Sequence, residues 1–148
     1  MGGFKKYPYV KCGVKQVYPN VQPGGPLFAN SVVAGNLVFV SGQTAVDPNT
    51  GICTTTTIQE QMEICMSNIK FALEEAGSSL EYMARMLIIL KDMKDYHAMR
   101  LAEQNFYKKH APSLLEDPPG STVFSPGHMA KDEFLVEIEV TGYIPCNE

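Results

Sequence analysis

Two glutamates near the C-terminus are the residues of this sequence best suited to acid–base chemistry. Glu137 and Glu139 lie in a stretch from Phe134 to Tyr143 that alternates apolar and polar residues. In an extended strand, side chains two residues apart share a face and lie roughly 7 Å apart. The pattern therefore predicts two carboxylates on one face of a strand. In a dry cleft, Glu137 could orient a water molecule or move its proton; as a surface or interface residue, it would pair with a neighbour.

Other polar residues are weaker candidates for binding a small molecule. Ser121 and Thr122 follow Gly120 and offer backbone N–H groups and hydroxyls for a carbonyl or an anion, although turn geometry also explains them. Arg100 could supply positive charge from a predicted helix, but it could equally be a surface arginine. His128 is a candidate acid or base because histidine is the side chain suited to that role near neutral pH, but in a loop it could simply be solvated.

Several kinds of chemistry are excluded by spacing. The cysteines form no C-x-x-C pair and the histidines no H-x-x-x-H pair, so no metal site is expected. Ser41 lacks the G-x-S-x-G surroundings of a hydrolase nucleophile. A net charge of −4 argues against nucleic-acid binding. The start of the chain carries no apolar segment of signal-peptide length, so a cytoplasmic protein without membrane attachment is expected.

The elements that must position these residues are read from periodicity. Residues 1–26 are rich in proline and glycine and predict an irregular arm with at most short strands, such as Val14 to Tyr18. Two β-branched runs around Gly35-Asn36 predict a hairpin that pairs 31–33 with 37–41. Thr57 and Glu60 form a capping-box pattern, and Gly77 ends the helix that it begins.

In the second half of the chain, predicted strands and helices continue to alternate. The apolar run that ends the segment 82–90 predicts a strand covered on both faces. Asp95 is expected to cap a second helix, 96–110, with Met99, Ala102 and Phe106 facing inward. A short strand is expected at 121–124 and a long, strictly alternating one at 134–143. The order ββαβαββ predicts a single α+β domain over residues 1–148, with one sheet and both helices on one face.

Several linked motifs resemble the RidA (YjgF) family. They are Asn36-Leu-Val-Phe-Val-Ser-Gly-Gln43 followed by Asp47-Pro-Asn-Thr-Gly51, Gln61 in the first predicted helix, Asn68-Ile-Lys70, Glu75-Ala-Gly-Ser-Ser79, Leu90-Lys-Asp-Met93 and Val136-Glu-Ile-Glu139. The resemblance implies a chorismate-mutase-like fold and a homotrimer with a barrel-like core. It also implies a small-molecule ligand in clefts between subunits and hydrolysis of reactive enamines and imines without a cofactor.

The site residues that the resemblance implies are only partly present. Gly42 and Glu137 match the family pattern. Phe28 stands where the family has a tyrosine, and Arg100 stands where it commonly has an asparagine. Gly120 replaces the arginine that grips the substrate carboxylate, and the loop after Phe124 is two residues longer, which places His128 in new sequence.

Three functions remain open on these residues. The first is a hydrolytic deaminase acting on an atypical substrate. The second is a trimer that binds or senses a ligand without catalysis, which an apolar pocket around Leu27 and Phe28 would favour. The third is a ribonuclease or translation inhibitor, as some family members have been described, which would need a basic groove.

Overall fold

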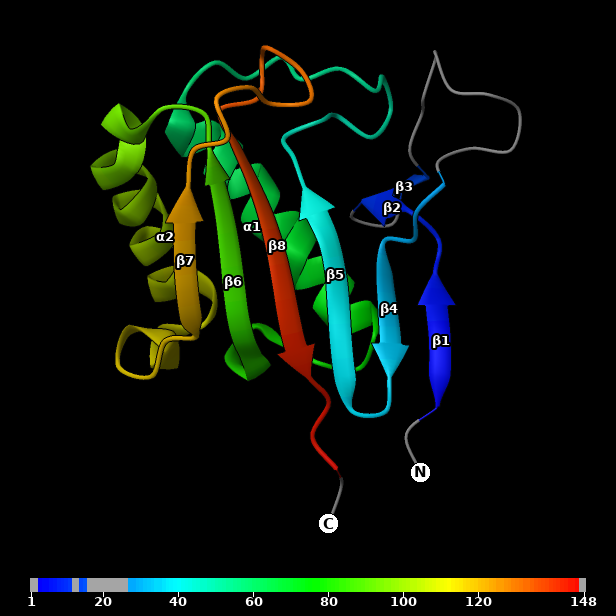
Figure 1. Ribbon diagram of the computed structural model, residues 1–148. Coiled ribbons are helices and arrows are strands. Elements are labelled where there is room, and N and C mark those ends of the chain that lie inside the picture. The colour runs from blue at the N-terminus through cyan, green and yellow to red at the C-terminus, as the bar shows by residue number, and fades with distance from the viewer. Residues whose placement is uncertain (1–2, 12–13, 16–26, 147–148) are drawn as a thin grey trace.

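The protein is built on one six-stranded sheet with the strand order β1-β4-β5-β8-β6-β7, shown in Figure 1. The computed structural model describes residues 3–11, 14–15 and 27–146. The strands of the sheet are β1 (Phe4–Tyr7), β4 (Ser31–Ala34), β5 (Leu37–Gln43), β6 (Met83–Leu90), β7 (Gly120–Phe124) and β8 (Val136–Tyr143). Neighbouring strands are antiparallel except for the parallel pair β6 and β7. The predicted order ββαβαββ and the α+β class are confirmed, within a sheet that β1 extends.

Two helices cover the same face of this sheet, α1 (Ile58–Glu75) and α2 (Tyr96–His110), as Figure 1 shows. The predicted start of α1 is confirmed, because the Thr57 side chain accepts a hydrogen bond from the Glu60 N–H and the Glu60 carboxylate accepts one from the Thr57 N–H. Gly77 follows the helix with a φ of +89°, which glycine adopts without steric cost. The remaining helical turns are η1 (Leu80–Tyr82), η2 (Met93–Asp95) and η3 (Pro112–Leu115).

The expected cap of α2 is wrong, although the predicted bounds of the helix are confirmed. Asp95 makes no capping hydrogen bond with its side chain because it closes the preceding turn η2 and is not in extended backbone. The Asp92 side chain instead accepts a hydrogen bond from the Lys94 N–H at 2.9 Å. Of the residues expected to face inward, Met99 and Phe106 are buried and Ala102 is partly buried.

The N-terminal arm contributes more strand than its composition predicts. β1 pairs with β4 and adds an edge to the sheet, while β2 (Val10–Lys11) and β3 (Val14–Lys15) form a separate two-stranded ribbon. The sequence of β1, Phe-Lys-Lys-Tyr, shows no apolar alternation, because an edge strand with lysines needs no buried face. The rest of the strand expected from Val14 to Tyr18 lies outside the described residues.

The two faces of the sheet differ in what covers them. Met86, Ile88 and Leu90 on β6 face the helices and are fully buried. Their neighbours Arg85, Leu87 and Ile89 lie on the opposite face, which we call the open face; there Arg85 is exposed and the other two are half-buried. Within one chain, therefore, β6 is covered on one face and not on both.

Candidate ligand site

A cavity of about 430 Å³ lies where β5 ends and β8 begins. Its walls come from the end of β5, the start of β8, the arm and the loops 44–57 and 125–135. The lining residues are Tyr9, Phe28, Ser41, Gly42, Thr44, Val46, Gly51, Ala130, Lys131, Phe134 and Glu137. The volume is that of a small-molecule site. Three of the sequence-predicted residues, Phe28, Gly42 and Glu137, therefore meet in one cavity.

The carboxylate of Glu137 is packed directly against the backbone of Gly42. A Cβ at position 42 would stand 2.0 Å from Glu137 Oε1 and 2.9 Å from its carboxyl carbon, so the Glu137 carboxylate would have to move to admit a side chain there. The pairing register of β5 and β8 shifts between Val40 and Gln43, so an irregularity in β5 brings Gly42 to this place. Glycine at position 42 thus sets where the Glu137 carboxylate lies.

The end of β5 is fixed by a buried hydrogen-bond cluster. Gln43 is fully buried, and its Nε2 donates to Asn30 Oδ1 at 3.1 Å and to the Ser41 carbonyl at 2.9 Å. The Ser41 hydroxyl donates to the Ala29 carbonyl at 2.7 Å. These bonds tie residues 29–30 to β5 and so carry Phe28 to the cavity.

Two rings line the cavity on the side of the arm. Tyr9 and Phe28 meet edge to face, with ring centroids 4.7 Å apart and an interplanar angle of 79°. Tyr9 is buried, whereas half of Phe28 is exposed. Phe28 lacks a hydroxyl, and Tyr9 brings a phenol to the same wall of the cavity.

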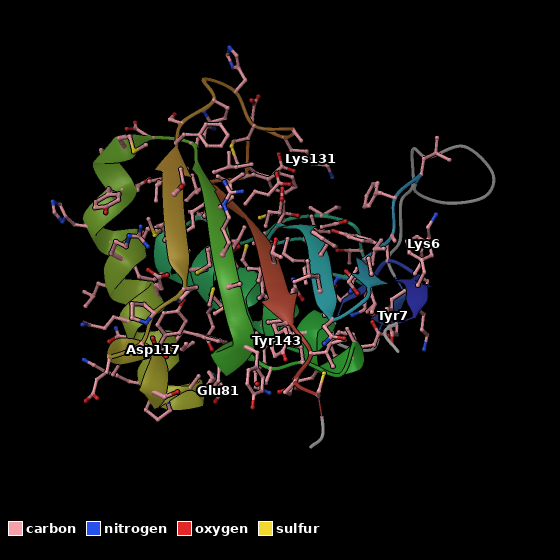
Figure 2. All side chains as sticks on the ribbon, turned by 60° about the horizontal axis from the view of Figure 1, so that its bottom comes forward. Lys6, Tyr7, Glu81, Asp117, Lys131 and Tyr143 are labelled. Atoms are coloured by element: carbon pink, nitrogen blue, oxygen red, sulfur yellow. The ribbon has the colours of Figure 1, made fainter. Side chains whose placement is uncertain are left out.

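Lys131 is the basic residue of the described cavity lining, and Glu137 is the acidic one. Lys131 Nζ donates to the Gly51 carbonyl at 3.2 Å and lies 5.8 Å from the centroid of the Phe134 ring. Figure 2 labels Lys131 at the opposite end of the sheet from Tyr143 and Glu81. A small ligand in this cavity would therefore meet an ammonium and a carboxylate.

One glutamine of α1 holds both of the loops that form the cavity. Gln61 is fully buried; its Nε2 donates to the carbonyls of Thr55 at 3.0 Å and Glu133 at 2.8 Å. Its Oε1 accepts from the Leu135 N–H at 2.8 Å. The Asn68 amide donates to the Thr44 carbonyl at 3.4 Å. The loop walls are thus anchored to a rigid helix.

Arg100 lies on the helix side of the sheet and not in the cavity. Its Nη1 pairs with Glu103 Oε2 at 2.8 Å, its Nη2 donates to the Ser121 hydroxyl at 3.1 Å, and its Nε to the Tyr96 hydroxyl at 3.3 Å. Burial lowers the pKa of Arg100, but these bonds and the charge of Glu103 outweigh it, and the net shift is upward. Glu103 also accepts a hydrogen bond from Tyr107 at 3.1 Å. Burial, together with this carboxylate, raises the pKa of Tyr107.

The other predicted residues are not brought to this cavity within one chain. Gly120, Ser121 and Thr122 begin the edge strand β7, where Gly120 pairs with Arg85 while Glu137 pairs with Ile89. Two strand spacings and four residues separate Gly120 from Glu137, a distance of roughly 16 Å. His128 is exposed in loop 125–135 and is not among the lining residues.

Sequence reasoning missed most of the cavity lining, including Tyr9 and Lys131, which bring a phenol and an ammonium. Both lie in segments without periodicity, so neither carries a secondary-structure signal. The extra length of the loop after Phe124 was a usable signal, but the structure places Lys131 in the cavity and not His128. Within the described ranges, no cluster of three or more His, Cys, Asp or Glu residues could hold a metal, and no helix is long and apolar enough to cross a bilayer.

Comparisons with known proteins agree with this fold. The family described as Endoribonuclease L-PSP matches residues 21–144. A RutC family protein of Pyrococcus abyssi is 32% identical over 122 residues, which cover 82% of this chain and 89% of the relative. The 2-iminobutanoate/2-iminopropanoate deaminase of Dermatophagoides farinae is 25% identical over 92 residues, covering 62% and 71%.

The structural comparison places the architecture in the same group. The YjgF gene product from E. coli has a TM-score of 0.77 at 20% identity, and the alignment covers 95% of this chain and 99% of that one. At this identity the similarity shows the fold, while the sequence matches above show the family. The chain therefore belongs to the Endoribonuclease L-PSP family, which includes the YjgF and RutC proteins.

Proposed function

We propose that this protein hydrolyses small enamines or imines without a cofactor, with Glu137 as the acid–base residue. The observation that carries the proposal is the position of the Glu137 carboxylate, set by contact with Gly42 in the wall of a small-molecule cavity. The name of the Dermatophagoides farinae relative, an imine deaminase, supports the reaction class.

The reaction needs one water and a group that moves protons. An enamine first becomes the imine by protonation at carbon, and water then adds to the imine carbon. Glu137 takes a proton from that water and gives it to the imine nitrogen, which yields a carbinolamine. Glu137 then moves a second proton from the carbinolamine hydroxyl to its amine nitrogen, which makes ammonia the leaving group. The C–N bond breaks, releasing ammonia and a carbonyl product, so that one imine and one water give one carbonyl compound and one ammonia.

A homotrimer is part of the proposal, because the open face of the sheet exposes several large apolar side chains within one chain. Leu37, Phe39, Phe124 and Tyr143 lie on this face and are each about two-fifths exposed. An exposed apolar face of this kind usually marks an interface. In an assembly, Gly120 and Thr122 of one subunit could approach the cavity of another. Light scattering at micromolar concentration should give three times the chain mass, and a monomeric mass would contradict the trimer.

Two other functions have some support. The aromatic and apolar lining of Phe28, Val46 and Phe134 favours a protein that binds a ligand without converting it. Leu27, expected beside Phe28, is fully exposed and does not line the cavity. The family description favours a ribonuclease, against which stands a net charge of −4. Salt-sensitive binding and cleavage of RNA by the pure protein would favour that function.

The direct test is ammonia release from freshly generated 2-aminoacrylate and 2-iminobutyrate, with wild type and Glu137→Gln compared at matched concentration. Wild type should accelerate release, and the variant should lose about 10²- to 10⁴-fold, because the amide cannot carry the proton. The variant should keep its melting temperature. No acceleration by wild type, alongside saturable binding of the 2-oxo acid, would favour the binding protein.

A further inference from the structure

We infer that Lys131 is the group of this chain that binds the carboxylate of an anionic ligand in the cavity. The inference rests on the proposed use of this cavity, and it adds a specificity residue to it. It comes from the disposition of charge and hydrogen bonds around one lysine.

The ammonium of Lys131 has donors left for a ligand. A lysine ammonium carries three N–H groups, and within the described part of the chain one of them is used, by the Gly51 carbonyl at 3.2 Å. The ion pairs among the described residues do not include Lys131. An anion that enters the cavity can therefore accept from Lys131 without displacing a carboxylate of the protein.

The position of Lys131 is fixed from several sides. The Phe134 N–H donates to the Lys131 carbonyl at 3.1 Å and closes a turn over residues 131–134. Gln61 anchors the two residues beside Phe134, and Lys91 Nζ donates to the Asp132 carbonyl. The Lys131 ammonium also stands over the ring of the buried Phe134, 5.8 Å from its centroid. Fixing the loop lowers the entropy lost when the ammonium binds a ligand.

The lining then defines the class of ligand. Lys131 suits a carboxylate, Glu137 suits a nitrogen that gains a proton, and Val46, Phe28 and Phe134 suit a short alkyl chain. A 2-imino acid carries all three groups within a few bonds. A lysine ammonium is a compact charge and cannot form the two parallel hydrogen bonds of an arginine guanidinium. It therefore attracts the carboxylate strongly but constrains its orientation little.

The test uses 2-oxobutyrate and its uncharged amide, 2-oxobutyramide, as probes in calorimetric titrations at low salt. Wild type should bind the acid more tightly than the amide. Lys131→Met should weaken binding of the acid roughly ten- to a hundredfold and leave binding of the amide unchanged, because one charge-assisted hydrogen bond is lost. Lys131→Arg should restore most of the preference. Lys108→Met, an exposed lysine of α2, is the matched control and should behave as wild type.

The outcomes separate this inference from the proposed reaction. A preference for the acid that survives in Lys131→Met would overturn the inference even if imine hydrolysis is intact. Loss of the preference in Arg85→Met, with none in Lys131→Met, would also overturn it and move the carboxylate site to the open face. If Lys131→Met loses the preference for the acid but wild type does not hydrolyse imines, the binding site would be supported and the proposed hydrolysis contradicted.

In the hydrolysis assay, Lys131→Met should raise KM for 2-iminobutyrate and change kcat little, whereas Glu137→Gln should lower kcat. A variant that merely loosened the loop would change both constants and the melting temperature, and Lys131→Arg would not rescue it. An unchanged KM in Lys131→Met would contradict the assignment.

Discussion

Two regions of this protein each contain an acidic and a basic residue, and the basic residue is bound differently in the two. On α2, Glu103 is buried and bonded to Arg100 and Tyr107, and Arg100 reaches Ser121 on β7. At the other region, Glu137 and Lys131 line the same cavity, and Lys131 belongs to none of the ion pairs of the described residues. The Arg100–Glu103 pair holds structural elements together, whereas the Lys131 ammonium keeps N–H groups for a ligand.

The largest effect on hydrolysis is expected from a substitution at Gly42. In Gly42→Ala the new Cβ would overlap Glu137 Oε1, which stands 2.0 Å away, and the carboxylate must move. Because the displaced atom is the end of a flexible side chain, stability should change little. We expect hydrolysis to fall about a hundredfold, the effect of misplacing a reacting group by an ångström. Activity and urea denaturation should be measured together.

The control for this change is Gly3→Ala, which precedes β1. A Cβ there meets nothing within 4 Å, so the added methyl group is tolerated. Equal losses of activity in the two alanine variants would mean that the Gly42 contact has no special role.

The second prediction concerns the paired region. Glu103→Ala removes the partner of Arg100 and Tyr107 from a buried place, so two donors lose their acceptor. We expect a loss of about 2 kcal/mol in the free energy of unfolding, because broken buried pairs are costly and Arg100 is only partly buried. Hydrolysis per folded molecule should stay at the wild-type rate, as judged below the melting transition.

An exposed glutamate provides the matched control. Glu81→Ala, on the turn η1, should change the free energy of unfolding by less than about 0.5 kcal/mol. A loss of hydrolysis in Glu103→Ala at full folding would mean that the α2 network also serves the reaction, against the distinction drawn above.

The fold was more predictable from sequence than the site, and particular residues show why. The signals at Thr57, Glu60 and Gly77 are local, so the bounds of α1 follow from the chain itself. The predicted cap at Asp95 was wrong because Asp95 belongs to the turn η2, which precedes α2 and keeps the Asp95 backbone out of the extended conformation. Local patterns predict such elements when no second element competes for the same residues.

The site depends on contacts between distant segments. The motif around Gly42 and that around Glu137 were found separately, but their contact follows from the irregular register of β5 against β8. Tyr9 and Lys131 reach the cavity from an arm and a loop that Gln61 and Asn30 help to position. No period or spacing in the sequence encodes those long-range hydrogen bonds.

The smallest predicted effect lies at a third carboxylate, Glu75, which differs from both Glu103 and Glu137. It ends α1, and its Oε2 is buried without a hydrogen-bond partner among the described residues. Burial raises the pKa of Glu75, and the positive charge of Lys5 only partly offsets the shift. The folded state therefore holds this proton more tightly than the unfolded state, and stability falls as the pH rises from the unfolded to the folded pKa.

Glu75→Gln removes that dependence. At pH 7 the variant should be more stable than wild type by about 0.5 kcal/mol, since a negative charge at a helix C-terminus is also unfavourable. The difference should vanish below the unfolded pKa, where both side chains are neutral. Urea denaturation from pH 3.5 to pH 7 measures it, with Glu81→Gln as control. A variant less stable than wild type at pH 7 would mean that Glu75 is ion-paired with Lys5, as Glu103 is with Arg100.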